Sequence, residues 1–173
     1  MYYFPLQIGN TWHYDYIMKW YENSGTSSHQ YTGIKTWQIV GCEVAGDLKT
    51  YRFMSVFNGL KIEGRSRSSG EAPSIFDTTV AVNETEYFTI KHLPTLQAEK
   101  GSALRCADLL GIVNAYDPAK GDTLTFKLAD MGDSSYAVFV KNVGMVRLKW
   151  KWISNSQIVE QYTLLSYTIQ NPP

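Results

Sequence analysis

The chain has 173 residues, a length that suits one domain with a core of its own. Its 16 basic and 16 acidic residues cancel, so it has no global field to attract nucleic acid or an anionic membrane surface. No run of about 18 apolar residues occurs, which argues against a transmembrane helix, and the 12 Tyr, 7 Phe and 5 Trp favour strands.

Long alternating strands are predicted in the N-terminal part. The first covers residues 12–21, where every second residue is aromatic or apolar and would share one face of a pleated strand. The second covers residues 30–43, with Lys35 and Trp37 on one side and Cys42 on the other. A turn is expected at Gly46-Asp47.

Two hairpins are predicted next. Asn58-Gly59 separates the strand-like residues 51–57 from 60–63, and an Asn-Gly pair between two such runs favours a type I′ turn. Asn83-Glu84 is expected to join residues 75–82 to residues 86–90 in the same way. Glu84 and Glu86, as well as the Asn83-Glu84-Thr85 sequon, are therefore interpreted as solvated residues of a turn.

Residues 93–117 form the least strand-like region. Ser102 is expected to cap a short helix over residues 103–110, which Gly111 ends. Strands are predicted again at residues 124–128, 136–140, 146–152 and 158–169. The C-terminal third is therefore β.

These elements predict a single, mostly β domain over residues 1–173, with about nine or ten antiparallel strands and one short helix. Sheets of this size tend to curl, close or split into layers. We expect a curved antiparallel sheet or a barrel-like half-barrel with the helix against its concave face, and a two-layer sandwich is the alternative.

The two ends of the chain resemble a known kind of domain. The opening from Tyr3 to Tyr14 fits the phrase Y-x-P-L-x-x-G-N-x-W-x-Y, and the later phrases Val143-Gly144-Met145-Val146 and Leu164-Leu165-Ser166-Tyr167 fit a VG-x-V and L-x-S-Y ending. Both are similar to uncharacterised bacterial exported and lipoprotein β domains. The resemblance implies the cell envelope, either periplasmic or extracellular, and it brings no catalytic motif. The opening residues lack a signal peptide, so the alternatives are a chain trimmed of its export signal and a cytoplasmic protein.

Motifs that carry chemistry are few. The sequence has no nucleophile elbow, phosphate loop or dinucleotide fingerprint, so no catalytic residue and no cofactor are assigned. His13 and Asp15 would share a strand face, but no third ligand is near, so no metal is assigned and a polar outer face is preferred. His29 and His92 are interpreted as surface residues. Cys42 and Cys106 form either one bridge or two buried thiols.

Nucleic-acid binding is not expected. Arg147, Lys149 and Lys151 alternate with Trp150 and Trp152, so strand geometry puts the charges and the rings on opposite faces.

The aromatic residues give the candidate site. Barrel interiors and mouths are common ligand sites, so one inward face is a candidate lining for an apolar cavity, although a plain core is the competing interpretation. The candidate ligand-binding residues are Trp12, Tyr14, Tyr16, Trp20, Trp37, Trp150 and Trp152. We expect a non-enzymatic, envelope-associated domain that binds an apolar small molecule, a lipid or a protein partner. The alternatives are a hydrolase whose site is assembled only in the fold, and a structural module of a surface assembly.

Overall fold

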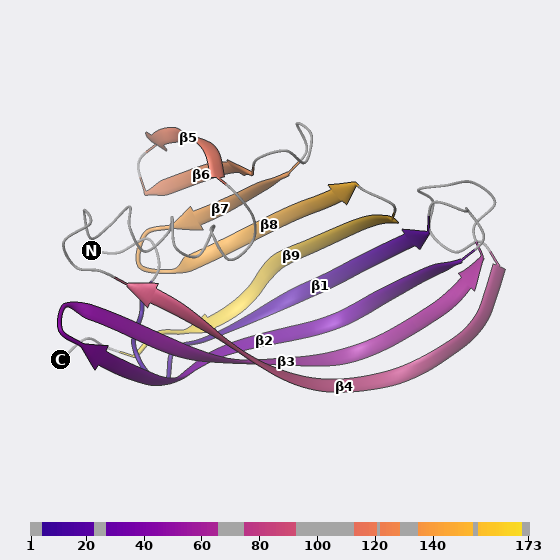
Figure 1. Cartoon of the computed structure of the whole chain (residues 1–173), viewed down its shortest axis with the longest axis horizontal. Helices are drawn as coiled ribbons and strands as arrows, with labels where there is room; N and C mark the ends of the chain where they lie inside the picture. The colour runs from indigo at the N-terminus through magenta and orange to yellow at the C-terminus, as the bar shows by residue number, and fades with distance from the viewer. Residues whose placement is uncertain are drawn as a thin grey trace.

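The computed structural model describes residues 5–22, 27–65, 75–92, 113–120, 122–128, 135–153 and 156–170. Described strands form one antiparallel sheet in the order β4-β3-β2-β1-β9-β8-β7-β6-β5 (Figure 1). The bounds are β1 Thr11–Glu22, β2 Ser28–Ala45, β3 Leu48–Arg65, β4 Ile75–His92, β5 Val113–Lys120, β6 Thr123–Leu128, β7 Tyr136–Val140, β8 Gly144–Ile153 and β9 Ser156–Thr168.

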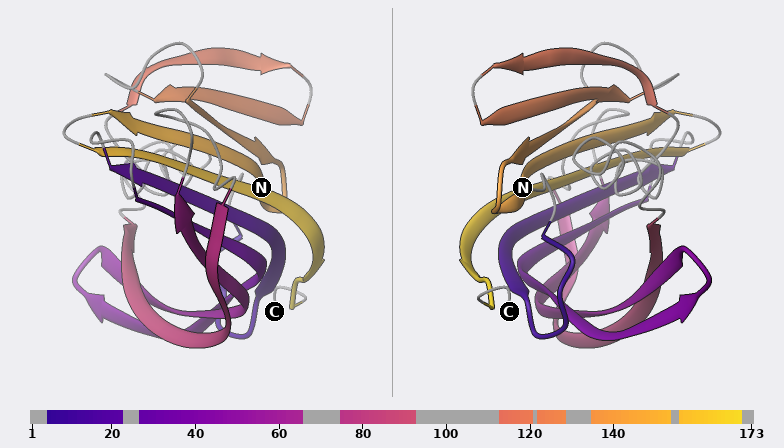
Figure 2. Two further views of the ribbon diagram at one scale, coloured as in Figure 1. Left: turned by 90° about the vertical axis from the view of Figure 1, so that its right-hand side faces the viewer. Right: turned by 90° about the vertical axis from the view of Figure 1, so that its left-hand side faces the viewer.

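The sheet is open. β4 and β5 lie at its opposite edges and no described strand joins them, as the end views in Figure 2 show. The expected barrel or half-barrel is therefore wrong, and the coarser prediction of a mostly β, antiparallel protein is confirmed. The helix expected at residues 103–110 lies outside the described residues. In the described part of the chain, no helix has the length and apolar character needed to cross a membrane.

Both predicted hairpin turns lie inside long strands. Asn58-Gly59 is in the middle of β3 and Asn83-Glu84 is in the middle of β4, where Asn58 pairs with Asn83. Among the described residues only Asn142 is a non-glycine with positive φ, so Asn58 does not adopt the type I′ conformation. Pairing of β3 along its length with both neighbours satisfies more backbone groups than two short hairpins would.

Glycine serves another purpose at this position. Gly59 of β3 lies opposite Gly33 of β2, and the two backbones approach so closely that neither strand has room for a Cβ. A Cβ built on Gly33 would lie 2.5 Å from the Gly59 Cα and still closer to the Asn58 carbonyl oxygen. The Asn-Gly pair therefore marks close backbone approach instead of a turn.

A register shift in β2 changes the face of the sheet on which the Cys42 side chain lies. The β2–β3 register shifts between Ile39 and Gly41, so the later residues of β2 are turned over relative to the earlier ones. Cys42 consequently packs against the core instead of lying on the outer side, and its thiol is free. Cys106 lies outside the described residues.

The core lies on one face of the sheet and consists largely of aromatic side chains. Trp12, Tyr14, Phe53 and Phe139 are fully buried, because alternate residues of neighbouring strands point to the same side. Phe53 and Phe88 stack with ring centroids 4.9 Å apart. The aromatic richness of the sequence is thus used mainly for packing between strands.

The side chain of Asn10 fixes the segment that leads into β1. The Asn10 side chain is fully buried, and its Nδ2 donates to the Pro5 carbonyl at 2.6 Å. Its Oδ1 accepts a hydrogen bond from the Gln170 amide at 2.8 Å, which ties the start of β1 to the end of β9. Gly9, with φ of 92°, makes the turn that brings Asn10 into this position.

Candidate functional site

The seven candidate aromatics occupy different environments. Trp12 and Tyr14 are fully buried, and both reach across β9. The Trp12 indole donates to the Val143 carbonyl at 2.5 Å, and the Tyr14 hydroxyl donates to the Met145 carbonyl at 3.1 Å. Trp37 is 4% exposed and packs edge-on against Tyr14. These three side chains are in the interior of the core.

The other tryptophans lie nearer its border. Trp20 stacks on His29 of β2 with ring centroids 4.8 Å apart, and the His29 side chain is 20% exposed, so its interpretation as a surface residue is wrong. Trp150 is partly buried against the core, whereas the side chain of Trp152 lies outside the described ones. Among the seven candidates, Tyr16 lines a cavity that carries further chemistry.

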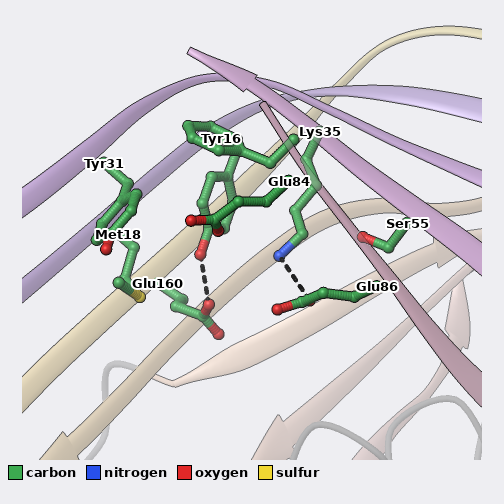
Figure 3. Close-up of a pocket in the computed structure, with 9 residues that line it drawn as sticks. Tyr16, Met18, Tyr31, Lys35, Ser55, Glu84, Glu86 and Glu160 are labelled. Atoms are coloured by element: carbon green, nitrogen blue, oxygen red, sulfur yellow. Dashed lines mark hydrogen bonds and ion pairs between the residues drawn. The ribbon is translucent and has the colours of Figure 1, made fainter. Parts of the chain in front are cut away.

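That cavity, which we call the central cleft, has a volume of about 300 Å³ and opens on the aromatic face of the sheet (Figure 3). Its lining comes from β1, β2, β3, β4 and β9, so residues far apart in sequence meet there. The lining residues are Tyr16, Met18, Tyr31, Lys35, Ser55, Phe57, Glu84, Glu86 and Glu160.

Cross-strand register explains why these side chains meet. Tyr14 pairs with Lys35, Lys35 with Phe57, and Phe57 with Glu84, so this row crosses four strands on one face. Ser55 pairs with Glu86 in the next row. Since β4 is one continuous strand, Glu84 and Glu86 both face the cleft, and their interpretation as turn residues is wrong.

One lysine and one tyrosine organise the charges. The Lys35 ammonium lies 4.5 Å from the centre of the Tyr16 ring and 4.0 Å from a Glu86 carboxylate oxygen. The Tyr16 hydroxyl donates to Glu160 Oε1 at 2.7 Å. Burial, reinforced by the nearby Glu160 carboxylate, raises the pKa of Tyr16 well above its ordinary value, so the phenol remains a donor.

Ser55 contributes an unsatisfied group. Its side chain is 2% exposed, and its Oγ has no hydrogen-bond partner among the described residues. In Figure 3 the hydroxyl points from β3 into the cleft. Buried hydroxyls are nearly always satisfied, so an unpaired one at a cavity wall indicates a place for a polar atom from outside the chain.

A smaller polar group borders the cleft. Glu63 contacts Lys61 at 2.5 Å and His29 at 3.4 Å, and the Lys61 ammonium lies 5.8 Å from the Tyr31 ring centre. Hydrogen bonding to Lys61 lowers the pKa of the exposed Glu63 carboxyl. The rim of the cleft therefore places an ammonium over a second tyrosine.

His13 and Asp15, the other pair considered for chemistry, lie on the opposite face of the sheet. His13 Nδ1 lies 2.9 Å from Thr36 Oγ1, and Asp15 is exposed. Described residues contain no group of three or more His, Cys, Asp or Glu side chains arranged to hold a metal ion.

Basic residues gather on that opposite face. Lys149 and Lys151 line a second cavity together with Lys19 and Ile17, whereas Trp150 packs toward the core. The separation of charges from rings that the alternation predicts for these positions of β8 is thus observed.

The sequence pattern predicted Tyr16 as a site residue but did not predict the polar residues that line the cleft with it. A usable signal was Lys35, a charged residue on the same strand face as Trp37, because an inward lysine requires a partner. Nothing local pointed to Glu160, which reaches the cleft only because β9 pairs with β1.

Comparison of the chain with known protein families, with curated proteins and with solved structures finds no match.

Proposed function

We propose that this domain is a non-catalytic binding module that takes a small molecule into the central cleft. The observation that carries the proposal is the Ser55 hydroxyl, which is buried, unpaired among the described residues and directed into a cavity of about 300 Å³. Ligand sites commonly have about this volume and combine aromatic walls with a few convergent polar groups.

The lining favours a ligand with both an apolar and a polar part. Tyr16, Tyr31, Phe57 and Met18 supply aromatic and thioether surface, while the remaining lining residues are polar or charged. A purely apolar molecule would leave the Ser55 hydroxyl without water or a partner, which costs free energy. We therefore narrow the expected ligand from an apolar molecule or lipid to an amphipathic small molecule.

The test is a fragment screen read by protein amide shifts in NMR. Binding in the cleft predicts that shift changes cluster on residues of β1, β2, β3 and β4 around Tyr16 and Ser55. The matched variant is Ser55→Ala, which removes the hydroxyl and little else and should weaken the best fragments. Absence of any fragment that shifts this cluster would overturn the proposal.

A hydrolase is the second candidate, and the observation in its favour is that Glu84, Glu86 and Glu160 line one cleft. Paired carboxylates serve as acid and base in glycoside hydrolysis. Here Glu86 contacts Lys35 and Glu160 accepts a hydrogen bond from Tyr16, so both carboxylates have structural partners. Turnover of aryl glycosides that is lost in Glu84→Gln would favour the enzyme over the binding module.

We also infer an envelope location in a bacterium. The support is the resemblance of the opening and closing phrases to exported and lipoprotein β domains. Fractionation of cells that express the protein from its own gene tests this inference, and recovery only in the cytoplasm would contradict it.

A further inference from the structure

We infer that the central cleft recognises a protonated amine, so that its ligand is a small organic cation with an apolar body. This inference rests on the proposed function and names the class of its ligand. It follows from the charges of the lining, from a cation that the cleft already holds, and from the Ser55 hydroxyl, which has no hydrogen-bond partner in the described part of the chain.

The first support is charge. The described residues that line the cleft include Glu84, Glu86 and Glu160 and one cation, Lys35, so this part of the lining carries an excess of negative charge. Glu84 and Glu86 are exposed and Glu160 is half-buried, and such an excess attracts a cation and repels an anion. Carboxylate ligands and phosphorylated ligands are therefore disfavoured.

The second support is the lysine itself. Lys35 places an ammonium 4.5 Å from the Tyr16 ring centre and 5.8 Å from the Tyr162 ring centre, with its stem largely buried. The aromatic wall and the Glu86 carboxylate thus already accommodate an alkylammonium. Because Lys35 is engaged with Glu86 and the Tyr16 hydroxyl bonds only one oxygen of Glu160, Glu84 and the second oxygen of Glu160 are left to receive a second ammonium.

The third support is the hydrogen-bonding capacity of the wall. An alkylammonium has three N–H donors and needs acceptors on more than one side. Carboxylates of β4 and β9 supply acceptors on two sides, and the Ser55 Oγ supplies a further one from β3. The apolar body of the ligand would then lie against Tyr31 and Phe57, whose rings meet edge to face at 6.0 Å.

Lys35 consequently acts as a tethered competitor. Its ammonium has the same charge as the ligand and lies in the same cleft, so it weakens the binding of a second cation. Removing that charge while keeping the straight side chain, as in Lys35→Met, should strengthen amine binding. A site for anions or for neutral sugars predicts the opposite sign, because Lys35 would then be a required donor.

The experiment compares three probes that share one ring and differ in charge: benzylamine, benzyl alcohol and benzoate. Dissociation constants come from NMR titration of the full chain at neutral pH and low salt. We expect benzylamine to bind about tenfold more tightly than benzyl alcohol, and benzoate not to bind. Raising the salt concentration should weaken the amine and leave the alcohol unchanged.

Variants sharpen the result. Glu84→Gln and Glu160→Gln should each weaken benzylamine by roughly three- to tenfold, and Lys35→Met should strengthen it by a similar factor. Glu43→Gln, an exposed carboxylate outside the cleft, is the matched control and should change nothing. Near-ultraviolet circular dichroism verifies that the aromatic core of each variant is intact.

The possible results distinguish failure of the cation inference from failure of the proposed binding function. Equal affinities for the amine and the alcohol, or weaker amine binding in Lys35→Met, would overturn the cation inference and leave the binding module standing. If neither probe shifts the cleft residues, the cation inference is overturned, and if the wider fragment screen is also silent, the proposed function is overturned with it.

Discussion

Replacing Gly33 by alanine tests the close approach of β2 and β3 directly. A Cβ on Gly33 would lie 2.5 Å from the Gly59 Cα and 3.0 Å from the Asn58 carbonyl carbon. Carbon atoms pack best at about 3.5–4.0 Å, so the neighbouring strand would have to move by roughly 1 Å. The atoms in the way belong to a backbone that is hydrogen-bonded on both sides, which leaves little room to adjust.

The change in the free energy of unfolding follows from two opposing contributions. Gly→Ala gains about 0.4–1 kcal/mol by restricting the unfolded chain where the native conformation suits alanine. Overpacking costs about 1–3 kcal/mol in cores. For Gly33 the overpacking cost dominates. For Gly41 of the same strand, where the nearest atom to a new Cβ is the Arg52 Cβ at 3.8 Å, only the gain applies.

Urea unfolding at equilibrium measures the difference. Gly33→Ala should be about 1–3 kcal/mol less stable than Gly41→Ala, because the gain is common to both, and this corresponds to a midpoint shift of roughly 1 M. Gly59→Ala should resemble Gly33→Ala, because its Cβ would approach the Thr32 carbonyl oxygen and the Phe57 ring. Equal midpoints for Gly33→Ala and Gly41→Ala would refute the claim that the two strands touch at these glycines.

Three further predictions concern the core and its edges. Asn10→Ala should lower the free energy of unfolding by about 1–3 kcal/mol in urea titrations, because two backbone groups lose their partner. Trp12→Phe should cost a similar amount, since the Val143 carbonyl loses its donor; an unchanged thermal midpoint would contradict that bond. Burial and then the charge of Glu160 raise the pKa of Tyr16 and Tyr162, so the folded state keeps protons that the unfolded state loses above pH 10. Stability should therefore fall as the pH rises through 10, and Tyr16→Phe should flatten that fall.

Local patterns predicted most of the strands. Alternation in β1, β2, β7, β8 and β9 places side chains of one kind every second residue, and those strands lie where the pattern puts them. The turn at Gly46-Asp47 is also confirmed, with Gly46 at φ of 59°. The number of strands is close to the prediction because the errors partly offset one another: each of the two predicted hairpins is one strand, and β5 was not predicted.

The Asn-Gly signal failed for a physical reason. A type I′ turn is favoured locally by a few tenths of a kcal/mol to about 1 kcal/mol, a preference of the kind that tertiary context overrides. Here β3 lies between two strands of equal length, and a turn at Gly59 would break both ladders. The same continuity brings Glu84 and Glu86 to the cleft, so one error about the fold became an error about the site.

The amino-acid sequence by itself determined the class of the protein and the inward faces of β1 and β8, because period-two alternation of aromatic and polar residues is a property of neighbouring positions. Only the tertiary structure decided that Lys35, Ser55, Glu84 and Glu160 meet around Tyr16. Those residues come from five strands that are paired through long-range registers, and such registers depend on backbone hydrogen bonds that no local pattern encodes.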